Sequence, residues 1–289
     1  MAFDTTRVPV DLIKHLTNGN CSLYVGAGLS QSSGLPNWEG LLKELIDEVK
    51  KLPYDTAQQV NDYAKMITDS NKFLMLASDL KSTLAKNFFE YLEKRFADQK
   101  LIPNNNHILL TDIPFEFIIT TNYDQLIEKA YAFNKHILHP VLTHSSSRDI
   151  AYKIWNKEFF ILKAHGDINI RKDEIVMTEK DYRDILFKNP GFQSALQVMF
   201  STKSILFVGT SFTDPDFILL MRYLHSAYHG GGPTHYILIN ENAILDTEAK
   251  RNMEDFNLHS IKFNPENDRE QITQFLEYLK ANTTMTAKA

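Results

Sequence analysis

Short runs of apolar residues recur along the chain and predict the strands of a buried sheet. Most of these runs are continuous rather than alternating, which is typical of parallel strands that are covered on both faces. Six runs have this character, and they span residues 21–25, 115–120, 159–164, 205–208, 236–239 and 260–263. We therefore expect a mostly parallel, six-stranded sheet.

Segments with the period of an α-helix lie between these runs. Residues 38–51, 214–228 and 268–281 repeat apolar positions every three or four residues, which gives each segment one apolar face. The segment 125–133, just after the second run, is also expected to be helical. Strands that alternate with helices indicate an α/β fold with a Rossmann-like, doubly wound sheet.

Two stretches interrupt the alternation. Residues 52–110 contain no strand-like run, and their periodic segments, such as 72–96, indicate helices throughout. In residues 136–157 we expect a loop and one further helix. We therefore divide the chain into a Rossmann-like domain at 1–51 and 111–282, a helical insertion at 52–110, and a flexible tail at 283–289.

Composition narrows the class of protein. The 289 residues include 31 Lys and Arg against 36 Asp and Glu, a net charge of −5, which argues against a protein built mainly to bind nucleic acid. The single cysteine, Cys21, can form neither an internal disulfide nor a four-cysteine zinc site. No run reaches the roughly 18–20 apolar residues of a membrane helix, and the amino terminus lacks a signal-peptide pattern. We expect a cytoplasmic protein without a membrane partner.

Glycine is scarce, with 11 residues in the chain, so its positions are informative. Gly26 and Gly28 directly follow the first run, where small residues let backbone N–H groups approach a diphosphate closely. Three positions after Gly28 the chain has Gln31, so the segment lacks the G-x-G-x-x-G pattern of dehydrogenases. A plain tight turn explains the same glycines, and this motif alone leaves both interpretations open.

Polar residues follow four of the other predicted strands. They are Thr121, Asn122 and Asp124 after the second strand, His165 after the third, Gly209, Thr210 and Ser211 after the fourth, and Asn240 after the fifth. The carboxyl ends of parallel strands form the ligand-binding edge of an open α/β sheet, so we expect one shared nucleotide cleft. A histidine at this edge is placed for proton transfer. Helix caps and strand-to-helix turns are the alternative explanation at each position.

Taken in order, these segments resemble the sirtuin superfamily. They are GAGLSQSSGLPNW at 26–38, TTNYD at 120–124, HGD at 165–167, GTS at 209–211 and IN at 239–240. Each motif is modest alone, and their order and spacing carry the resemblance. Sirtuins bind NAD at this edge of the sheet, so the resemblance implies that NAD is the substrate and that the reaction needs no metal.

The resemblance also implies a role for each residue. The turn at 26–30 would contact the diphosphate, Asn122 and Asp124 would line the nicotinamide and its ribose, and His165 would face that ribose. Residues 209–211 with Asn240 would frame the adenosine side. In this scheme Asn122 and His165 are the catalytic pair. The implied NAD-binding residues are Gly26, Ala27, Gly28, Ser30, Asn37, Thr121, Asn122, Asp124, Gly209, Thr210, Ser211 and Asn240.

The chain also departs from the deacylating sirtuins. These carry a zinc module with paired CxxC motifs, whereas this chain has only Cys21, and Asn37-Trp38-Glu39 lacks the arginine expected after the G-x-P segment. The segments IVMTEKDY at 175–182 and GTSFTDPDF at 209–217 resemble instead the sirtuin-like proteins of bacterial anti-phage defence. Such a short chain resembles the sirtuin-like subunit that is encoded beside a HerA-type ATPase.

These resemblances imply an NAD+ glycohydrolase that releases nicotinamide and ADP-ribose in anti-phage defence. They also imply a homo-oligomer with a HerA-type ATPase as partner. Three other readings stay open: a protein deacylase or ADP-ribosyltransferase, a sensor that binds NAD or ADP-ribose without turnover, and a purely structural assembly subunit. The missing zinc module weighs against deacylation, and the Asn122 and His165 pair weighs against a sensor.

Overall fold

The computed structural model describes residues 2–210 and 215–283, and its centre is a parallel sheet. Seven strands lie in the order β3-β4-β2-β1-β5-β6-β7. Their bounds are β1 Cys21–Val25, β2 Ile118–Thr120, β3 Val141–Thr143, β4 Ile161–Lys163, β5 Ser204–Val208, β6 His235–Asn240 and β7 Leu258–Phe263. Every pair of neighbouring strands is parallel. The predicted Rossmann-like, doubly wound α/β fold is confirmed.

The expected number of strands was one too few. Strand β3 lies in the stretch 136–157, for which we expected only a loop and a helix, and it pairs with β4 at the edge of the sheet. It has three residues, Val141 is only half-buried, and Pro140 precedes it. A strand this short shows no apolar run, which is why the pattern did not reveal it. The expected helix of this stretch is α8, Ser147–Asn156.

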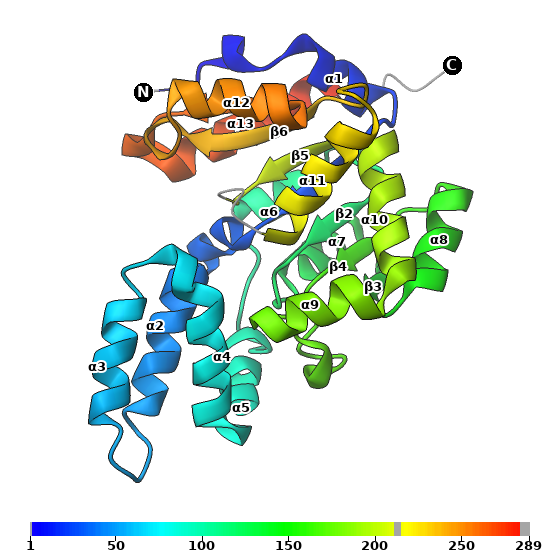
Figure 1. Cartoon of the computed structure of the whole chain (residues 1–289). Coiled ribbons are helices and arrows are strands. Elements are labelled where there is room, and N and C mark those ends of the chain that lie inside the picture. The colour runs from blue at the N-terminus through cyan, green and yellow to red at the C-terminus, as the bar shows by residue number, and fades with distance from the viewer. Residues whose placement is uncertain (1, 211–214, 284–289) are drawn as a thin grey trace.

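Helices cover both faces of the sheet (Figure 1). One face packs against α8, α9 Glu179–Lys188, α10 Pro190–Thr202, α11 Pro215–Ala227 and α12 Asp246–Phe256. The other face packs against α1 Val10–Thr17, α6 Asn105–Leu110, α7 Leu126–Lys135 and α13 Asp268–Thr283. Within the described residues, no helix combines the length and the apolar character needed to cross a membrane. Residues 284–289 of the predicted tail lie outside the described residues.

Four helices between β1 and β2 form a separate lobe, drawn in blue and cyan in Figure 1. They are α2 Trp38–Val49, α3 Ala57–Met66, α4 Phe73–Leu84 and α5 Lys86–Phe96. Their apolar faces enclose a cluster around Leu42, Leu80 and Phe88, each fully buried. Ala85, with φ +49° and ψ −116°, separates α4 from α5. The same cluster takes in Tyr123, so the lobe packs directly beneath the segment that follows β2.

The register places the carboxyl ends of five strands in one row. Val25 pairs with Thr120 on one side and Val208 on the other, Thr120 pairs with Lys163, and Lys163 pairs with Thr143. The chain order reverses at β1, because β2 lies on one side of it and β5 on the other. Open α/β sheets bind their ligands at such a switch point, so we expect a ligand to bind among the segments that follow this row.

Candidate active site

Three glycines let the turns after β1 and β5 touch backbone to backbone. Gly28 N–H donates to the Gly209 carbonyl over 2.8 Å. A Cβ atom on Gly26 would lie 2.5 Å from the Gly209 carbonyl oxygen, and one on Gly209 would lie 2.5 Å from the Leu29 nitrogen. Gly209 has φ +71°, a left-handed conformation that favours glycine. These glycines therefore have a packing role at the switch point, and contact with a diphosphate stays a prediction.

A buried hydroxyl connects the first two predicted motifs. Ser30 lies in the 3-10 helix η2, Ala27–Ser33, and is 1% exposed. Its hydroxyl donates to Asp124 Oδ2 over 3.0 Å and accepts from Asn122 Nδ2 over 3.2 Å. His107 Nε2 lies 3.5 Å from the same oxygen. Because a hydroxyl has one proton to donate and two lone pairs, these three partners satisfy Ser30 completely.

His107 also belongs to this network, although no sequence motif marks it. Its Nδ1 atom accepts from the Asn104 backbone N–H over 3.4 Å, so Nε2 carries the proton that points to Ser30. Burial lowers the pKa of His107 to about 4, against the opposing effect of the Asp124 charge. The ring is therefore neutral at physiological pH. His107 lies in the first turn of α6 and does not follow a strand, so the pattern of polar strand ends does not indicate it.

Asn122 and Asp124 have different roles in the network. Asp124 Oδ1 accepts from the Leu126 N–H at the start of α7 over 2.9 Å, so the helix-capping interpretation is correct for Asp124. Asn122 instead donates through Nδ2 to the Gly26 carbonyl over 3.2 Å and to Ser30. Among the described residues, Asn122 Oδ1 accepts no hydrogen bond from the protein. This oxygen is thus available to a hydroxyl or a water molecule.

His165 follows β4, the neighbour of β2. Asn122 and His165 each stand two residues beyond the paired Thr120 and Lys163, so they leave the sheet side by side. The His165 ring is 6% exposed and meets the Tyr182 ring edge to face, with centroids 5.0 Å apart. Burial, and then the nearby His144, lower the pKa of His165 to about 3. The ring is therefore neutral at physiological pH, with one nitrogen as a hydrogen-bond donor and the other as an acceptor.

His144 is a second histidine at this edge, and it was missed together with β3. It directly follows that strand and is 7% exposed. Its Nε2 atom donates to the Glu174 carbonyl over 2.9 Å. The same carbonyl oxygen would lie 2.7 Å from a Cβ atom on Gly166, which has φ +86°. His144 and Gly166 therefore fix the segment around Glu174 against the His165 turn.

Comparison with known proteins assigns the family. A family model described as the SIR2-like domain matches residues 116–261, half of the chain, and this range contains Asn122, Asp124 and His165. The chain belongs to the SIR2-like family. The glycine turn at 26–30 lies outside the matched range, and hydrogen bonds connect it to Asn122, Asp124 and Gly209 within that range.

Curated relatives of this SIR2-like chain have names that refer to NAD+ and to defence. It is 30% identical over 91% of its length to "NAD(+) hydrolase ThsA" of Cytobacillus dafuensis, of which it covers 50%. It is 24% identical over 74% of its length to "Defense-associated sirtuin 2" of Bacillus subtilis, of which it covers 20%. The chain spans about half the length, or less, of these relatives. A solved structure of Sir2Tm with a propionylated peptide aligns over 95% of this chain and 98% of its own, with 14% identity and a TM-score of 0.48.

The remaining predicted residues lie in helix caps and in the turns after the strands. Asn37 is exposed and caps α2, because its Oδ1 atom accepts from the Gly40 N–H over 2.8 Å. Asn240 does the same for the Asn242 N–H after β6, also over 2.8 Å. Ala27, Thr121 and Thr210 are half-buried at the row of strand ends. Ser211 lies outside the described residues, and the roles of all these positions in binding NAD stay predictions.

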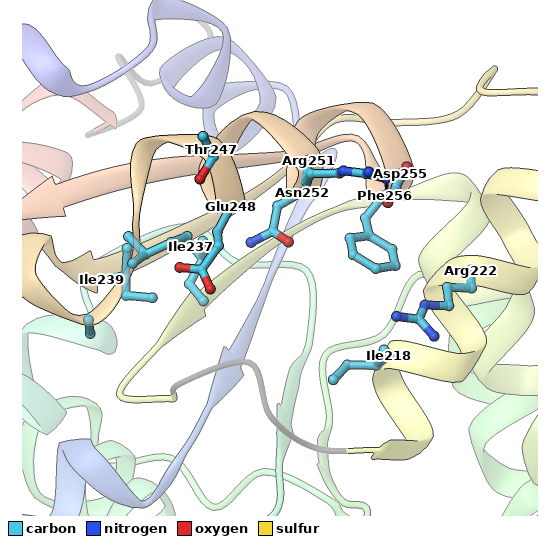
Figure 2. Close-up of a pocket in the computed structure, with 12 residues that line it drawn as sticks. Ile218, Arg222, Ile237, Ile239, Thr247, Glu248, Arg251, Asn252, Asp255 and Phe256 are labelled. Atoms are coloured by element: carbon cyan, nitrogen blue, oxygen red, sulfur yellow. Dashed lines mark ion pairs between the residues drawn. The ribbon is translucent and has the colours of Figure 1, made fainter.

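A cavity of about 580 Å³ lies between α11 and α12, over β6 (Figure 2). Its floor is apolar, with Ile237 and Ile239 from the strand and Phe256 from α12, and the Arg222 guanidinium lies 5.8 Å from the Phe256 ring. Of the predicted site residues that the structure describes, none lines this cavity. Ile239 directly precedes Asn240, so the cavity adjoins the strand end where the adenosine side of NAD was predicted.

The described part of the chain has no group of three His, Cys, Asp or Glu side chains arranged to hold a metal ion. Cys21 begins β1 and is fully buried, and this burial raises the pKa of its thiol. A buried thiol with a raised pKa is a poor nucleophile and a poor metal ligand. Its position is that of a small apolar residue in the core.

Proposed function

We propose that this chain cleaves NAD+ to nicotinamide and ADP-ribose. The observation that carries the proposal is the buried Ser30, Asn122, Asp124 and His107 network beside a neutral His165, at the switch point of a parallel sheet. The relatives named NAD(+) hydrolase ThsA support the same activity. This chain covers 50% and 56% of two of those proteins, and product analysis tests whether it has the same activity.

The reaction breaks the bond between the ribose C1′ atom and nicotinamide. Its transition state has the character of an oxocarbenium ion, as in glycoside hydrolysis. Nicotinamide leaves from a cationic ring, so the site must chiefly fix the ribose, stabilise positive charge and place a water. In our scheme Asn122 Oδ1 holds a ribose hydroxyl or the attacking water, and Asp124 supplies negative charge nearby. His165 Nδ1 or Nε2 accepts the proton released during the attack.

We further propose a place for this chain in anti-phage defence, as an oligomer with a HerA-type ATPase. The support is the resemblance of the segments at 175–182 and 209–217, together with the relative named Defense-associated sirtuin 2. Purification of the tagged chain from its native host tests the partner. Recovery of an ATPase in fixed ratio supports the complex, and recovery of the chain alone speaks against it.

The alternative enzymes act on proteins. A deacylase or an ADP-ribosyltransferase would use the same cleft to cleave NAD+, but would pass the ribosyl group to an acyl-lysine or to a protein side chain. The absence of paired CxxC motifs from the sequence disfavours the first. Addition of an acetylated peptide during NAD+ turnover tests it, because a deacylase yields O-acetyl-ADP-ribose whereas a glycohydrolase yields free ADP-ribose.

The direct test follows the products from NAD+ by chromatography. We expect the wild-type chain, with any partner that co-purifies, to release nicotinamide and ADP-ribose in equal amounts. His165→Ala is the paired variant and is expected to lose turnover. A protein that binds NAD+ with no product in either preparation is a sensor, and that result would overturn the proposal.

A further inference from the structure

A buried lysine joins the two segments of the proposed active site. Lys163 is the last residue of β4 and is 0% exposed. Its Nζ atom donates to Asp167 Oδ2 over 2.8 Å, to the Tyr123 carbonyl over 3.3 Å, and to the Asp124 carbonyl. Glu128 Oε1 on α7 lies 3.2 Å away on the same side. The ammonium therefore contacts the segment after β2, the segment after β4 and the helix between them.

An ammonium at this position is not explained by stability alone. Removal of a lysine charge from water costs several kcal/mol, and a buried ion pair is often no more stable than apolar side chains of similar volume. The neighbouring strand residues Ile161 and Leu162 show that this sheet buries apolar side chains well. A lysine supplies what an apolar residue lacks, namely three N–H donors with fixed directions.

The Lys163 N–H donors bind next to both proposed catalytic residues, Asn122 and His165. Asn122 directly precedes the two residues whose carbonyls Lys163 binds. His165 lies midway between Lys163 and Asp167, and Asp167 Oδ1 is itself fixed by the Asn169 N–H over 2.7 Å. The strands hold the row up to Thr120 and Lys163. Beyond that row, the Lys163 side chain connects the Asn122 segment to the His165 segment.

We propose that Lys163 is a positioning residue for NAD+ cleavage, which sets the separation of Asn122 from His165 without touching the substrate. This inference rests on the proposed function. A displacement of catalytic groups by about 1 Å is enough to cost on the order of 10²-fold in rate. Loss of Lys163 should therefore lower kcat while NAD+ still binds, because the turns after β1 and β5 do not depend on this ammonium.

The test is a variant that removes the buried charges together, Lys163→Met with Glu128→Gln and Asp167→Asn. The variant removes the three charges of the cluster, and the buried Asp124 carboxylate keeps its hydrogen bonds from the Ser30 hydroxyl and the Leu126 N–H, so the fold is expected to survive. We expect kcat for nicotinamide release to fall about 10²-fold and KM to change by less than about threefold. Hydrogen exchange should accelerate at residues 121–125 and 164–168 and stay slow in β1 and β5. Asp167→Asn alone, which alters one atom of the cluster, should also lower kcat. This single variant keeps the proposal testable if the larger variant does not fold.

A matched control lies at the amino-terminal ends of the strands, opposite the proposed active site. Lys203 pairs with Glu116 and donates to the Gly19 carbonyl over 3.1 Å, and both side chains are about four-fifths buried. Lys203→Met with Glu116→Gln should lower the melting temperature and leave kcat unchanged. Folded Lys163 and Asp167 variants with the wild-type kcat would overturn the positioning role, whereas a wild-type chain without turnover would instead overturn the proposed function.

Discussion

Three buried histidines of this protein are neutral in the folded state. Burial lowers the pKa of His165 and of His235 to about 3 and that of His107 to about 4. In the unfolded chain each pKa returns to about 6.5. Between these values the unfolded state binds more protons than the folded state, so the free energy of unfolding falls as the pH is lowered from about 6.5 towards 4.

This difference gives a prediction for stability. Each of the three histidines contributes up to about 1.4 kcal/mol per pH unit to the loss. We expect urea unfolding at pH 7, 6 and 5 to show a steadily falling free energy. His235→Gln, which removes one buried ring at the start of β6, should reduce the slope, and His229→Asn, at an exposed left-handed position, should not. Stability that stays level or rises from pH 7 to pH 5 would contradict the buried, neutral assignment.

At the scale of single residues the sequence identified the site only in part. Asn122, Asp124 and Ser30 stand beside glycine turns and strand ends, and the structure does bring them together. His107, His144 and Lys163 lie in contact with these segments but carried no such signal. His107 is in a helix and His144 follows a strand too short to detect. Lys163 lies within an apolar run, and a pattern of hydrophobic positions does not indicate what its ammonium contacts.

Among the elements, the turns after β1 and β5 depend on glycine for close packing. In Gly209→Ala the new methyl would meet the Leu29 backbone at 2.5 Å, and backbone atoms cannot rotate away. We expect a cost of ~1–3 kcal/mol for the clash in addition to ~1–2 kcal/mol for the left-handed conformation. Gly19→Ala is the control, because Gly19 has a similar φ of +67° and nothing within 4 Å of the added atom. Equal losses in urea unfolding would show that packing between the two turns contributes nothing.

Six of the seven strands were predictable from short apolar runs, most of which are continuous and buried. The missed strand β3 has three residues and one partner, so its place at the edge is set by β4 rather than by its own sequence. The segment 72–96, predicted to be helical, forms two helices, because Ala85 between them adopts a non-helical conformation that the apolar periodicity does not reveal. Tertiary contacts decide such details, and periodicity does not report them.

For the whole molecule, the helical lobe bears on assembly. We predict that residues 52–110 contact other protomers. Deletion of the segment is a poor test, because it removes His107 and the cluster that supports Tyr123. Met75→Glu on α4, where Met75 is 49% exposed, is a gentler change. We expect it to reduce the mass of the assembly in light scattering, with Trp155→Glu on α8 as control. An unchanged mass for Met75→Glu would contradict a role for this surface.

A second whole-molecule prediction concerns metal content. The chain has one cysteine, and Cys21 is buried inside β1. We expect elemental analysis of the purified protein to find no stoichiometric zinc. One zinc per chain would overturn this expectation and would revive the deacylase alternative.

The central claim is that Asn122 and His165 act together on NAD+, and a double-mutant cycle on nicotinamide release tests it most directly. We expect Asn122→Ala and His165→Ala each to lower turnover by about 10²–10⁴-fold, and the double variant to be little slower than either, because the two act as one unit. Asn122→Ala also leaves the Gly26 carbonyl and the Ser30 hydroxyl with fewer partners, at about 1–3 kcal/mol of stability. NAD+ affinity should fall less than turnover. Near wild-type turnover in His165→Ala, or fully additive losses in folded variants, would contradict the account.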